Sequence, residues 1–176
     1  HQSQKIRDLL IKYDMLDCAP RTVPIQTNFK LNVALDGEKL CDAEKQKYQS
    51  IVGSFLWINR GTRPDISEAT WILARGMSSP TKELLDAAWH CLRYLKGTMD
   101  RKLTYSRTKN SSLDLKAYDY NPAIPTGFCD SNWDVPVSQS CNLIMFCNGA
   151  LMWGTKKQDS TALSTVQAEL CALSEQ

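Results

Sequence analysis

The sequence predicts an α+β protein in which a helical region comes before a small, mainly antiparallel sheet. Over residues 2–16 and from residue 42 to Gly97, apolar residues recur every three or four positions, as they do along one face of an α-helix. After Gly97 the pattern changes to short apolar runs, which are typical of strands. This change of period predicts a domain boundary near residue 110, with a helical region over residues 1–109 and a second domain over residues 110–176.

Four helices are expected before residue 100. The first covers residues 2–16 and should stop before Pro20. Residues 17–40 contain two prolines and show weak periodicity, so an extended connector is expected there. The second helix should begin with Asp42 as its N-cap and end at Gly61.

A proline marks the start of both the third and the fourth predicted helix. Pro64 falls in the expected first turn of the third helix, where proline is tolerated because the N–H it lacks would be unpaired anyway. Pro80 and Thr81 precede the fourth helix, which should close at Gly97 in the C-terminal cap position.

The apolar runs after Gly97 predict a sheet of short strands. Asn148 and Gly149 separate two such runs and predict a hairpin, because a tight turn needs residues that tolerate positive φ. A final helix should begin near Ser164 or Thr165. The predicted strands cover residues 103–106, 113–118, 126–129, 143–147 and 150–155.

Composition restricts the class of protein but names no function. Hydrophobic residues make up 43% of the 176 residues and charged residues 23%, a balance that supports a buried core. No run approaches the roughly 18 apolar residues that span a bilayer, so we expect no membrane partner and an intracellular location, in cytoplasm or nucleus. The seven cysteines are odd in number and never spaced C-x-x-C, which predicts free thiols. A net charge of +2 does not by itself indicate a polyanionic partner.

Six short sequence blocks stand in order along the chain. The helical region contains Tyr48-Gln-Ser-Ile-Val-Gly-Ser-Phe-Leu-Trp57, Thr62-Arg-Pro-Asp-Ile66, and Pro80-Thr81 followed by Leu92-Arg-Tyr-Leu-Lys-Gly-Thr98. The second domain contains Gly127-Phe-Cys-Asp-Ser-Asn-Trp133, Gly149-Ala-Leu-Met-Trp-Gly-Thr-Lys-Lys-Gln158 and Ala162-Leu-Ser-Thr-Val-Gln-Ala-Glu-Leu170. Together they resemble the Pol polyprotein of copia-type retrotransposons, whose blocks include T-R-P-D-I, L-R-Y-L-K-G-T, G-Y-S-D-A-D-W and S-K-K-Q.

The resemblance implies that the chain is a fragment of a reverse transcriptase and ribonuclease H polyprotein, whose remainder is a partner. In that family the first three blocks follow the catalytic carboxylates of the polymerase, in helices that connect it to ribonuclease H. This sequence contains no adjacent Asp-Asp pair, so the polymerase metal site is absent from it. Nucleotide addition is therefore not expected of this chain.

The last three blocks resemble the beginning of a ribonuclease H fold, a three-stranded antiparallel meander followed by its first helix. Such enzymes cleave the RNA of RNA–DNA hybrids with two divalent metals, and Mg²⁺ requires hard oxygen ligands. The resemblance assigns Asp130 and Glu169 to two catalytic metal-ligand positions. The remaining ligands lie beyond this chain, and Asn132 and Gln167 stand where the family usually has acids. We therefore expect this fragment to bind Mg²⁺ weakly or not at all and to be non-catalytic.

Positive charges concentrate after the fourth predicted helix. Residues 93–109 contain six cations and one acid. Phosphates attract such clusters through counterion release, which predicts weak binding of an RNA–DNA hybrid or other nucleic acid without sequence preference. A solvated protein face is the alternative. The candidate contacts are Arg93, Lys96, Arg101, Lys102, Lys156 and Lys157.

Several other residues are expected to be structural. Arg63 should pair with Asp65 or with a helix end, and His90 should be a helix residue and not a catalytic base. Four tryptophans fall on apolar stripes and are expected in the core, not as platforms for base stacking: Trp57, Trp71, Trp89 and Trp153.

Two functional hypotheses remain from the sequence. The first is an enzyme fragment, whose parent copies RNA into DNA and cleaves the hybrid. The second is a diverged or domesticated module that binds nucleic acid or protein without catalysis. The reading frame on either side of this chain distinguishes them, because the first hypothesis predicts an Asp-Asp motif upstream.

Overall fold

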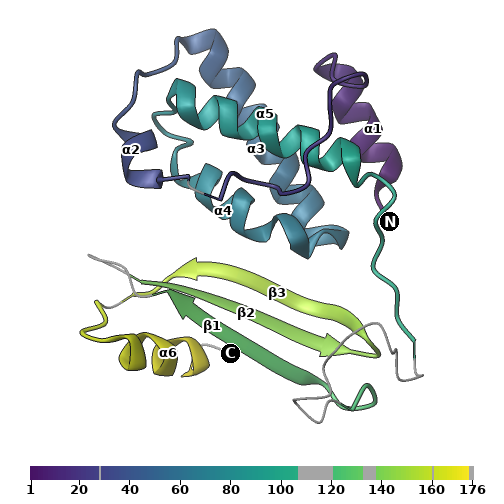
Figure 1. The fold of residues 1–176 in the computed structure, drawn as a ribbon, viewed down its shortest axis with the longest axis vertical. Helices are drawn as coiled ribbons and strands as arrows, with labels where there is room; N and C mark the ends of the chain where they lie inside the picture. Colours follow the sequence, from purple (N-terminus) through teal and green to yellow (C-terminus); the bar gives the residue numbers. More distant parts are fainter. Residues whose placement is uncertain (28, 107–120, 133–137, 160, 175–176) are drawn as a thin grey trace. The chain divides into compact units, whose positions relative to one another are not determined.

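The chain divides into two compact units, His1–Lys102 and Leu103–Gln176 (Figure 1). In the described residues, the first unit holds helices and the second holds a sheet and one helix, which confirms the α+β prediction. The predicted boundary at residues 109–110 and the predicted strand over residues 113–118 lie outside the described part of the chain. The computed structural model describes residues 1–27, 29–106, 121–132, 138–159 and 161–174.

The described part of the helical unit contains five α-helices, where the sequence predicted four. The additional helix is α2, within the stretch predicted as an extended connector. Its five residues are too few to show a helical period. The helices are α1 Ser3–Lys12, α2 Leu31–Leu35, α3 Asp42–Thr62, the 3-10 helix η1 Pro64–Ile66, α4 Ser67–Arg75 and α5 Lys82–Gly97.

Helix α1 ends before the residue 16 that its apolar stripe predicted. Asp14 adopts a left-handed conformation with a φ of 55°. The N–H of Asp14 donates to the carbonyl of Ile11 at 3.1 Å, and that of Met15 donates to the carbonyl of Leu10 at 2.9 Å. These bonds form a Schellman motif, which closes a helix by satisfying its last carbonyls. The prediction was wrong because apolar residues continue past the point where the backbone turns.

The ends of α3 also differ from the prediction. Cys41, and not Asp42, is the N-cap, and the helix continues through Gly61 to Thr62. A Cβ at position 61 would overlap the side-chain amide of Gln2, so the glycine provides room for the segment before α1 and does not end the helix. The buried face of α3 consists of Tyr48, Ile51, Val52, Phe55 and Ile58.

The start of α5 agrees with the prediction. Thr81 is the N-cap, and its Oγ1 accepts a hydrogen bond from the N–H of Leu84 at 3.4 Å. The same hydroxyl donates to the carbonyl of Ala34 at 2.6 Å and thereby ties α2 to α5. At the other end, Gly97 is the last helical residue and Thr98 is the C-cap, one residue later than predicted.

The helices of the first unit surround one apolar core. Ile6 and Leu10 of α1, Leu73 of α4 and Leu92 of α5 are buried together with the inner face of α3. The hydroxyl of Tyr48 donates to the carbonyl of Leu73 at 2.6 Å, which satisfies a polar atom inside this core. No helix in the described residues is both long and apolar enough to cross a membrane.

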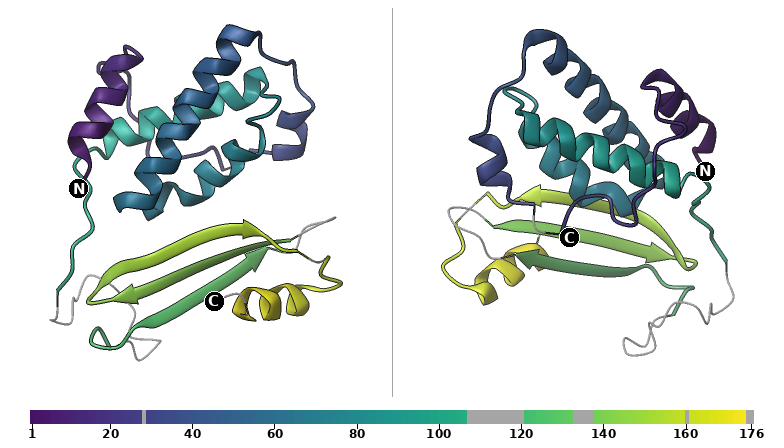
Figure 2. Two further views of the ribbon diagram at one scale, coloured as in Figure 1. Left: turned by 180° about the vertical axis from the view of Figure 1, so that it is seen from behind. Right: turned by 45° about the horizontal axis from the view of Figure 1, so that its top comes forward.

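The second unit contains a three-stranded antiparallel meander in the order β1-β2-β3 (Figure 2). The strands are β1 Thr126–Asn132, β2 Gln139–Phe146 and β3 Gly149–Lys157, which confirms the three strands predicted in this region. Residues 103–106 were also predicted as a strand and do not form one.

The predicted hairpin joins β2 to β3, but its turn lies one residue earlier than expected. Cys147 and Asn148 are the central residues, with φ of 49° and 61°. Two positive φ values are typical of a type I′ turn, which matches the twist of the flanking strands. The N–H of Ser106 donates to the carbonyl of Cys147 at 2.7 Å, so the segment predicted as a strand is bound to the turn instead.

Helix α6, Thr165–Ser174, begins where the sequence predicted and packs against β1 and β2. Its buried residues are Ala168 and Ala172. Gln158 follows β3 and is 2% exposed. Its Nε2 donates to Ser140 Oγ at 2.9 Å and to the carbonyl of Ala168 at 2.8 Å. These bonds fix α6 on the sheet face that carries the Ser140 side chain.

Candidate functional site

The outer face of α3 carries a tryptophan that the sequence placed in the core. Trp57 is 57% exposed, so that prediction is wrong. At about 100° per residue, Trp57 lies about 200° around the helix from buried Phe55. The sequence offered too many apolar residues for one stripe, and periodicity alone did not show which of them face solvent. The other three tryptophans that were expected in the core, Trp71, Trp89 and Trp153, are half-buried.

Cations surround the exposed ring of Trp57. Nζ of Lys5, on α1, lies 5.5 Å from the ring centroid, a cation–π distance. Arg60 is exposed three residues after Trp57, on the same side of α3. Lys12 Nζ donates to Ser50 Oγ at 2.9 Å and adds a second contact between α1 and α3. An aromatic face bordered by positive charge is suited to nucleic acid.

Gly53 lies one turn before Trp57 and is not explained by packing within the described chain. A Cβ at this position would meet nothing within 4 Å. Glycine inside a helix costs roughly 0.5–1 kcal/mol relative to alanine. A smooth surface at Gly53 would allow a ligand backbone to approach α3 closely. We name Lys5, Gly53, Trp57 and Arg60 the Trp57 face.

Two of the predicted phosphate contacts hold the connector onto α5. Arg93 Nε donates to the carbonyl of Ala19 at 2.7 Å, and Lys96 Nζ donates to the carbonyl of Cys18 at 2.6 Å. Both accepting groups are neutral, so the positive charges are not cancelled by these bonds. His90, on the same helix, bonds through Nε2 to a carbonyl of the connector at 3.0 Å. Burial, and then the nearby arginines, lower the pKa of His90.

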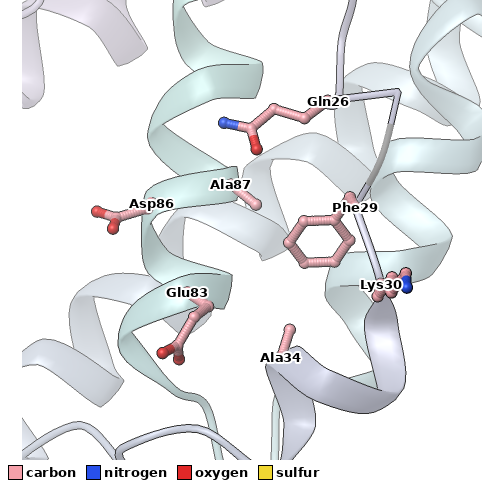
Figure 3. A pocket seen from close by; sticks show the side chains of 7 residues that line it. All are labelled: Gln26, Phe29, Lys30, Ala34, Glu83, Asp86 and Ala87. Carbon is pink, nitrogen blue, oxygen red and sulfur yellow. The ribbon is translucent and has the colours of Figure 1, made fainter.

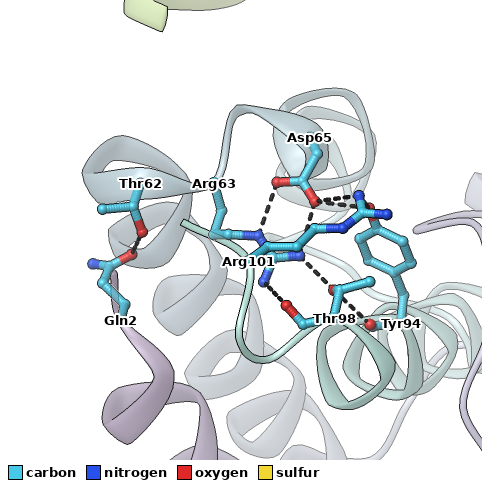
Figure 4. Close-up of polar contacts among 7 residues, drawn as sticks. All are labelled: Gln2, Thr62, Arg63, Asp65, Tyr94, Thr98 and Arg101. Carbon is cyan, nitrogen blue, oxygen red and sulfur yellow. Dashed lines mark hydrogen bonds and ion pairs between the residues drawn. The ribbon is translucent and has the colours of Figure 1, made fainter. Parts of the chain in front are cut away.

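Arg63 and Asp65 form the pair that the sequence predicted (Figure 4). The Arg63 guanidinium is 1% exposed. It donates from Nε and Nη2 to the two carboxylate oxygens of Asp65, at 2.9 and 2.8 Å. It also donates to the carbonyl and hydroxyl oxygens of Thr98, at 3.0 and 2.6 Å. The pair therefore joins η1 to the end of α5.

Asp65 is the centre of this network (Figure 4). The hydroxyl of Tyr94 donates to Asp65 Oδ2 at 2.7 Å and accepts from Arg101 Nη1 at 2.8 Å. Arg101 also lies 3.6 Å from the Asp65 carboxylate. Burial would raise the pKa of Asp65, but the hydrogen bonds from Arg63 and Tyr94 outweigh it and lower that pKa. Arg101, a predicted phosphate contact, thus already has an internal partner.

The other predicted cations lie on exposed positions. Lys102 and Lys157 are exposed and form no ion pair with any residue that the structure describes. Lys156 is exposed at the end of β3 beside Lys157. Lys102 belongs to the helical unit and the other two to the second unit.

The two predicted metal ligands, Asp130 and Glu169, lie on adjacent elements. Asp130 is on β1 and Glu169 on α6, these elements pack together, and both residues are exposed. Asp130 pairs with Cys141, and the neighbouring Ser131 pairs with Ser140.

Because side chains alternate along a strand, Asp130 lies on the sheet face opposite to the one that carries Ser140 and α6. This register does not favour a metal held between Asp130 and Glu169 across one face, and their pairing stays a prediction. No group of three or more His, Cys, Asp or Glu side chains placed to hold a metal occurs among the described residues.

Comparison with known proteins gives the family. The Pol polyprotein of transposon TNT 1-94 from Nicotiana tabacum is 31% identical over 99% of this chain. The Pol polyprotein of transposon RE1 from Arabidopsis thaliana is 34% identical over 96% of it. An uncharacterised mitochondrial protein of Arabidopsis thaliana is 32% identical over 98%.

This chain covers only part of each relative. It spans 13% of the tobacco polyprotein, 11% of the Arabidopsis polyprotein and 66% of the mitochondrial protein. No family model and no solved structure matches the chain. The similarity to the polyproteins nevertheless extends over nearly all 176 residues, and the chain belongs to the family of copia-type retrotransposon Pol polyproteins.

Proposed function

We propose that this chain is the part of a reverse transcriptase and ribonuclease H polyprotein that follows the polymerase active site, and that its helical unit holds nucleic acid. The observation that carries this proposal is the Trp57 face, an exposed aromatic ring beside an unobstructed glycine and between cations. The nucleic acid would be the RNA–DNA hybrid that the parent enzyme makes and degrades.

The chemistry of the Trp57 face suits binding without sequence preference. The ring offers apolar surface to a sugar or a base, and Lys5 and Arg60 offer charge to phosphates. The face has no pair of side-chain amides or guanidiniums fixed toward base edges, as sequence recognition would require. Arg93 and Lys96 could add phosphate contacts while they hold the connector.

In this proposal the second unit is a partial ribonuclease H-like domain. Its meander followed by a helix has the element order with which that fold opens. Carboxylates of the Asp130 and Glu169 type suit Mg²⁺, which would help to generate hydroxide and stabilise the leaving oxygen when bound. Two carboxylates are fewer than two-metal chemistry requires. We therefore propose that hydrolysis belongs to the complete polyprotein and not to these residues alone.

The experiment that tests the nucleic-acid proposal is fluorescence anisotropy with a labelled RNA–DNA hybrid at low salt. Replacing Trp57 by alanine should weaken binding about tenfold, since stacking or apolar contact by one aromatic is worth roughly 1–3 kcal/mol. The matched control is Trp71→Ala, whose half-buried ring packs with Arg75 on α4. Equal losses for the two variants, or no binding by the unmodified chain, would contradict the proposal.

One observation favours the alternative of a protein-interaction module. Helix α6 exposes apolar side chains at spacings of three and four residues, on the side opposite to buried Ala168 and Ala172. Such a stripe is typical of a helix that packs on two sides. A chain that failed to bind hybrid would favour this alternative. The stripe consists of Val166, Leu170 and Leu173, and exposed Leu163 lies just before the helix.

A further inference from the structure

The helical unit contains a hollow of about 380 Å³ between the α2 segment and the first turns of α5 (Figure 3). Its apolar surface comes from the ring of Phe29 and the methyl groups of Ala34 and Ala87. Its polar surface includes the amide of Gln26 and the carboxylate of Glu83. The volume is in the lower range of ligand pockets, which suits one long side chain and its neighbours better than a cofactor.

Hydrogen bonds fix the walls of this hollow in place. On the α2 side, the Thr81 hydroxyl donates a hydrogen bond to the carbonyl of Ala34 at 2.6 Å. The N–H of Lys82 donates to the carbonyl of Glu38 at 3.0 Å and joins the next segment to the start of α5. The hollow is therefore largely preformed, so a ligand would not have to order it.

The polar edge of the hollow is negative. Glu83 forms no hydrogen bond or ion pair with any residue that the structure describes, and its carboxylate lies against Gly37, where a Cβ would overlap it. The neighbouring cation, Lys82, is already paired with Glu38 at 2.8 Å. The hydrogen bond with Glu38 raises the pKa of Lys82, and the charges of Glu44 and Glu83 add to this effect.

The helix dipole of α5 does not by itself explain the position of Glu83. An acid in the first turn of α5 is favourable with the helix dipole, but this does not account for the aromatic hollow beside it. Asp86 also lines the hollow and extends away from the Phe29 ring (Figure 3). Lys30 lines it as well and adds one positive charge. Glu83 lies at the edge of the hollow with its carboxylate turned toward Gly37, and it is the lining carboxylate nearer to the Phe29 ring (Figure 3).

The negative charge of Glu83 indicates which class of ligand the hollow suits. Phosphates would be repelled by Glu83, so this hollow does not suit nucleic acid. No set of three metal-ligating side chains occurs here or elsewhere in the described residues, so a metal ion is not favoured either. A cation with a planar head and an apolar stem complements all three features, namely the ring, the methyl groups and the carboxylate.

We propose that this hollow binds an arginine side chain presented by a basic polypeptide segment. The guanidinium stacks on Phe29 and forms a two-point hydrogen-bonded pair with Glu83. Its aliphatic stem covers Ala34 and Ala87, and the amide oxygen of Gln26 accepts one of the remaining N–H groups. Arginine suits the geometry better than lysine, because an ammonium neither stacks nor pairs at two points. This polypeptide partner is distinct from the nucleic acid proposed for the Trp57 face. The inference does not depend on nucleic-acid binding by that face.

The test is an NMR titration of the ¹⁵N-labelled full chain with a blocked alanine pentapeptide whose central residue is arginine. The amides of Phe29, Ala34 and Ala87 should shift on addition of this peptide. A second peptide with citrulline in place of arginine keeps the shape but removes the charge. It should bind at least about tenfold more weakly, because it cannot form a charge-assisted hydrogen bond with Glu83.

Two variants separate the hollow from general surface charge. Glu83→Gln should lower the affinity for the arginine peptide by a similar factor. Asp86→Asn removes an equal charge that points away from the Phe29 ring, so it should change this affinity little. Circular dichroism would confirm that both variants keep their helices. The proposal is overturned by equal affinity for the arginine and citrulline peptides, by equal effects of the two variants, or by shifts outside the hollow.

Discussion

At the residue scale, Gly53 gives a prediction in which stability and binding move in opposite directions. Gly53→Ala should raise the free energy of unfolding by about 0.5–1 kcal/mol, because alanine favours the helix and its Cβ meets nothing within 4 Å. The same methyl group should weaken binding of the hybrid if the ligand approaches α3 at this point. Urea denaturation and fluorescence anisotropy measure the two effects. A stabilised variant with unchanged affinity would remove Gly53 from the Trp57 face.

Asp65 gives a prediction about pH at the same scale. Its pKa is lowered in the folded chain, so its contribution to stability is complete above the unfolded pKa of about 3.9 and is lost as pH falls through the lower, folded pKa. Asp65→Asn should cost roughly 3–5 kcal/mol at pH 7, since it leaves the buried Arg63 charge without its partner.

The Asp65→Asn loss should shrink as pH falls below about 4, where protonation removes the same charge from the unmodified chain. Denaturation curves at several pH values measure this, with exposed Asp159→Asn as the control. A loss independent of pH would assign the effect of the substitution to packing. The sequence predicted that Arg63 of T-R-P-D-I would pair with Asp65 or with a helix end, and its guanidinium bonds to both Asp65 and Thr98.

At the element scale, the sequence located the long elements and missed those that depend on a few residues. Helix α5 was predicted from the period of its apolar residues, and the three strands were predicted from short apolar runs. Helix α2 has too few residues for a period, and the end of α1 depends on the positive φ of Asp14, which the apolar pattern does not report. Trp57 was misplaced because an apolar stripe does not indicate how much of it a small core can cover.

The β2–β3 hairpin gives the prediction for this scale. A Cβ at Gly149 would lie 2.5 Å from Cδ1 of Tyr105, whose hydroxyl donates to the carbonyl of Ala150 at 2.8 Å. Gly149→Ala should therefore displace the ring and cost about 1–3 kcal/mol. The control is Gly154→Ala, where the Cβ would meet only the end of the Asn142 side chain at 3.0 Å. Thermal unfolding that affected both variants equally would contradict the role of Tyr105.

At the scale of the whole molecule, the family blocks identified the polyprotein, but they did not locate the surface that we propose to bind nucleic acid. Asp130 and Glu169 could be named from motifs, whereas the face of the sheet on which Asp130 lies follows from strand pairing, which a motif does not contain. The Trp57 face combines α1 with α3, and the Phe29 hollow combines the α2 segment with α5. Contacts between segments distant in sequence are the part of a site that one sequence does not display.

The salt dependence of hybrid binding tests which of the basic residues contact phosphates. If Arg101 and Lys102 both do so, replacing both by alanine should lower the slope of log K against log salt by up to about 1.8, at about 0.9 for each phosphate that is no longer neutralised. The two residues should not contribute equally to this change in slope. Lys102 forms no ion pair among the described residues, while Arg101 is held by Tyr94 and lies 3.6 Å from Asp65. Lys102→Ala should therefore lower the slope by up to about 0.9, and Arg101→Ala by less, with a loss of stability instead. An unchanged slope in the double variant would assign both residues to a solvated face and leave binding to the Trp57 face.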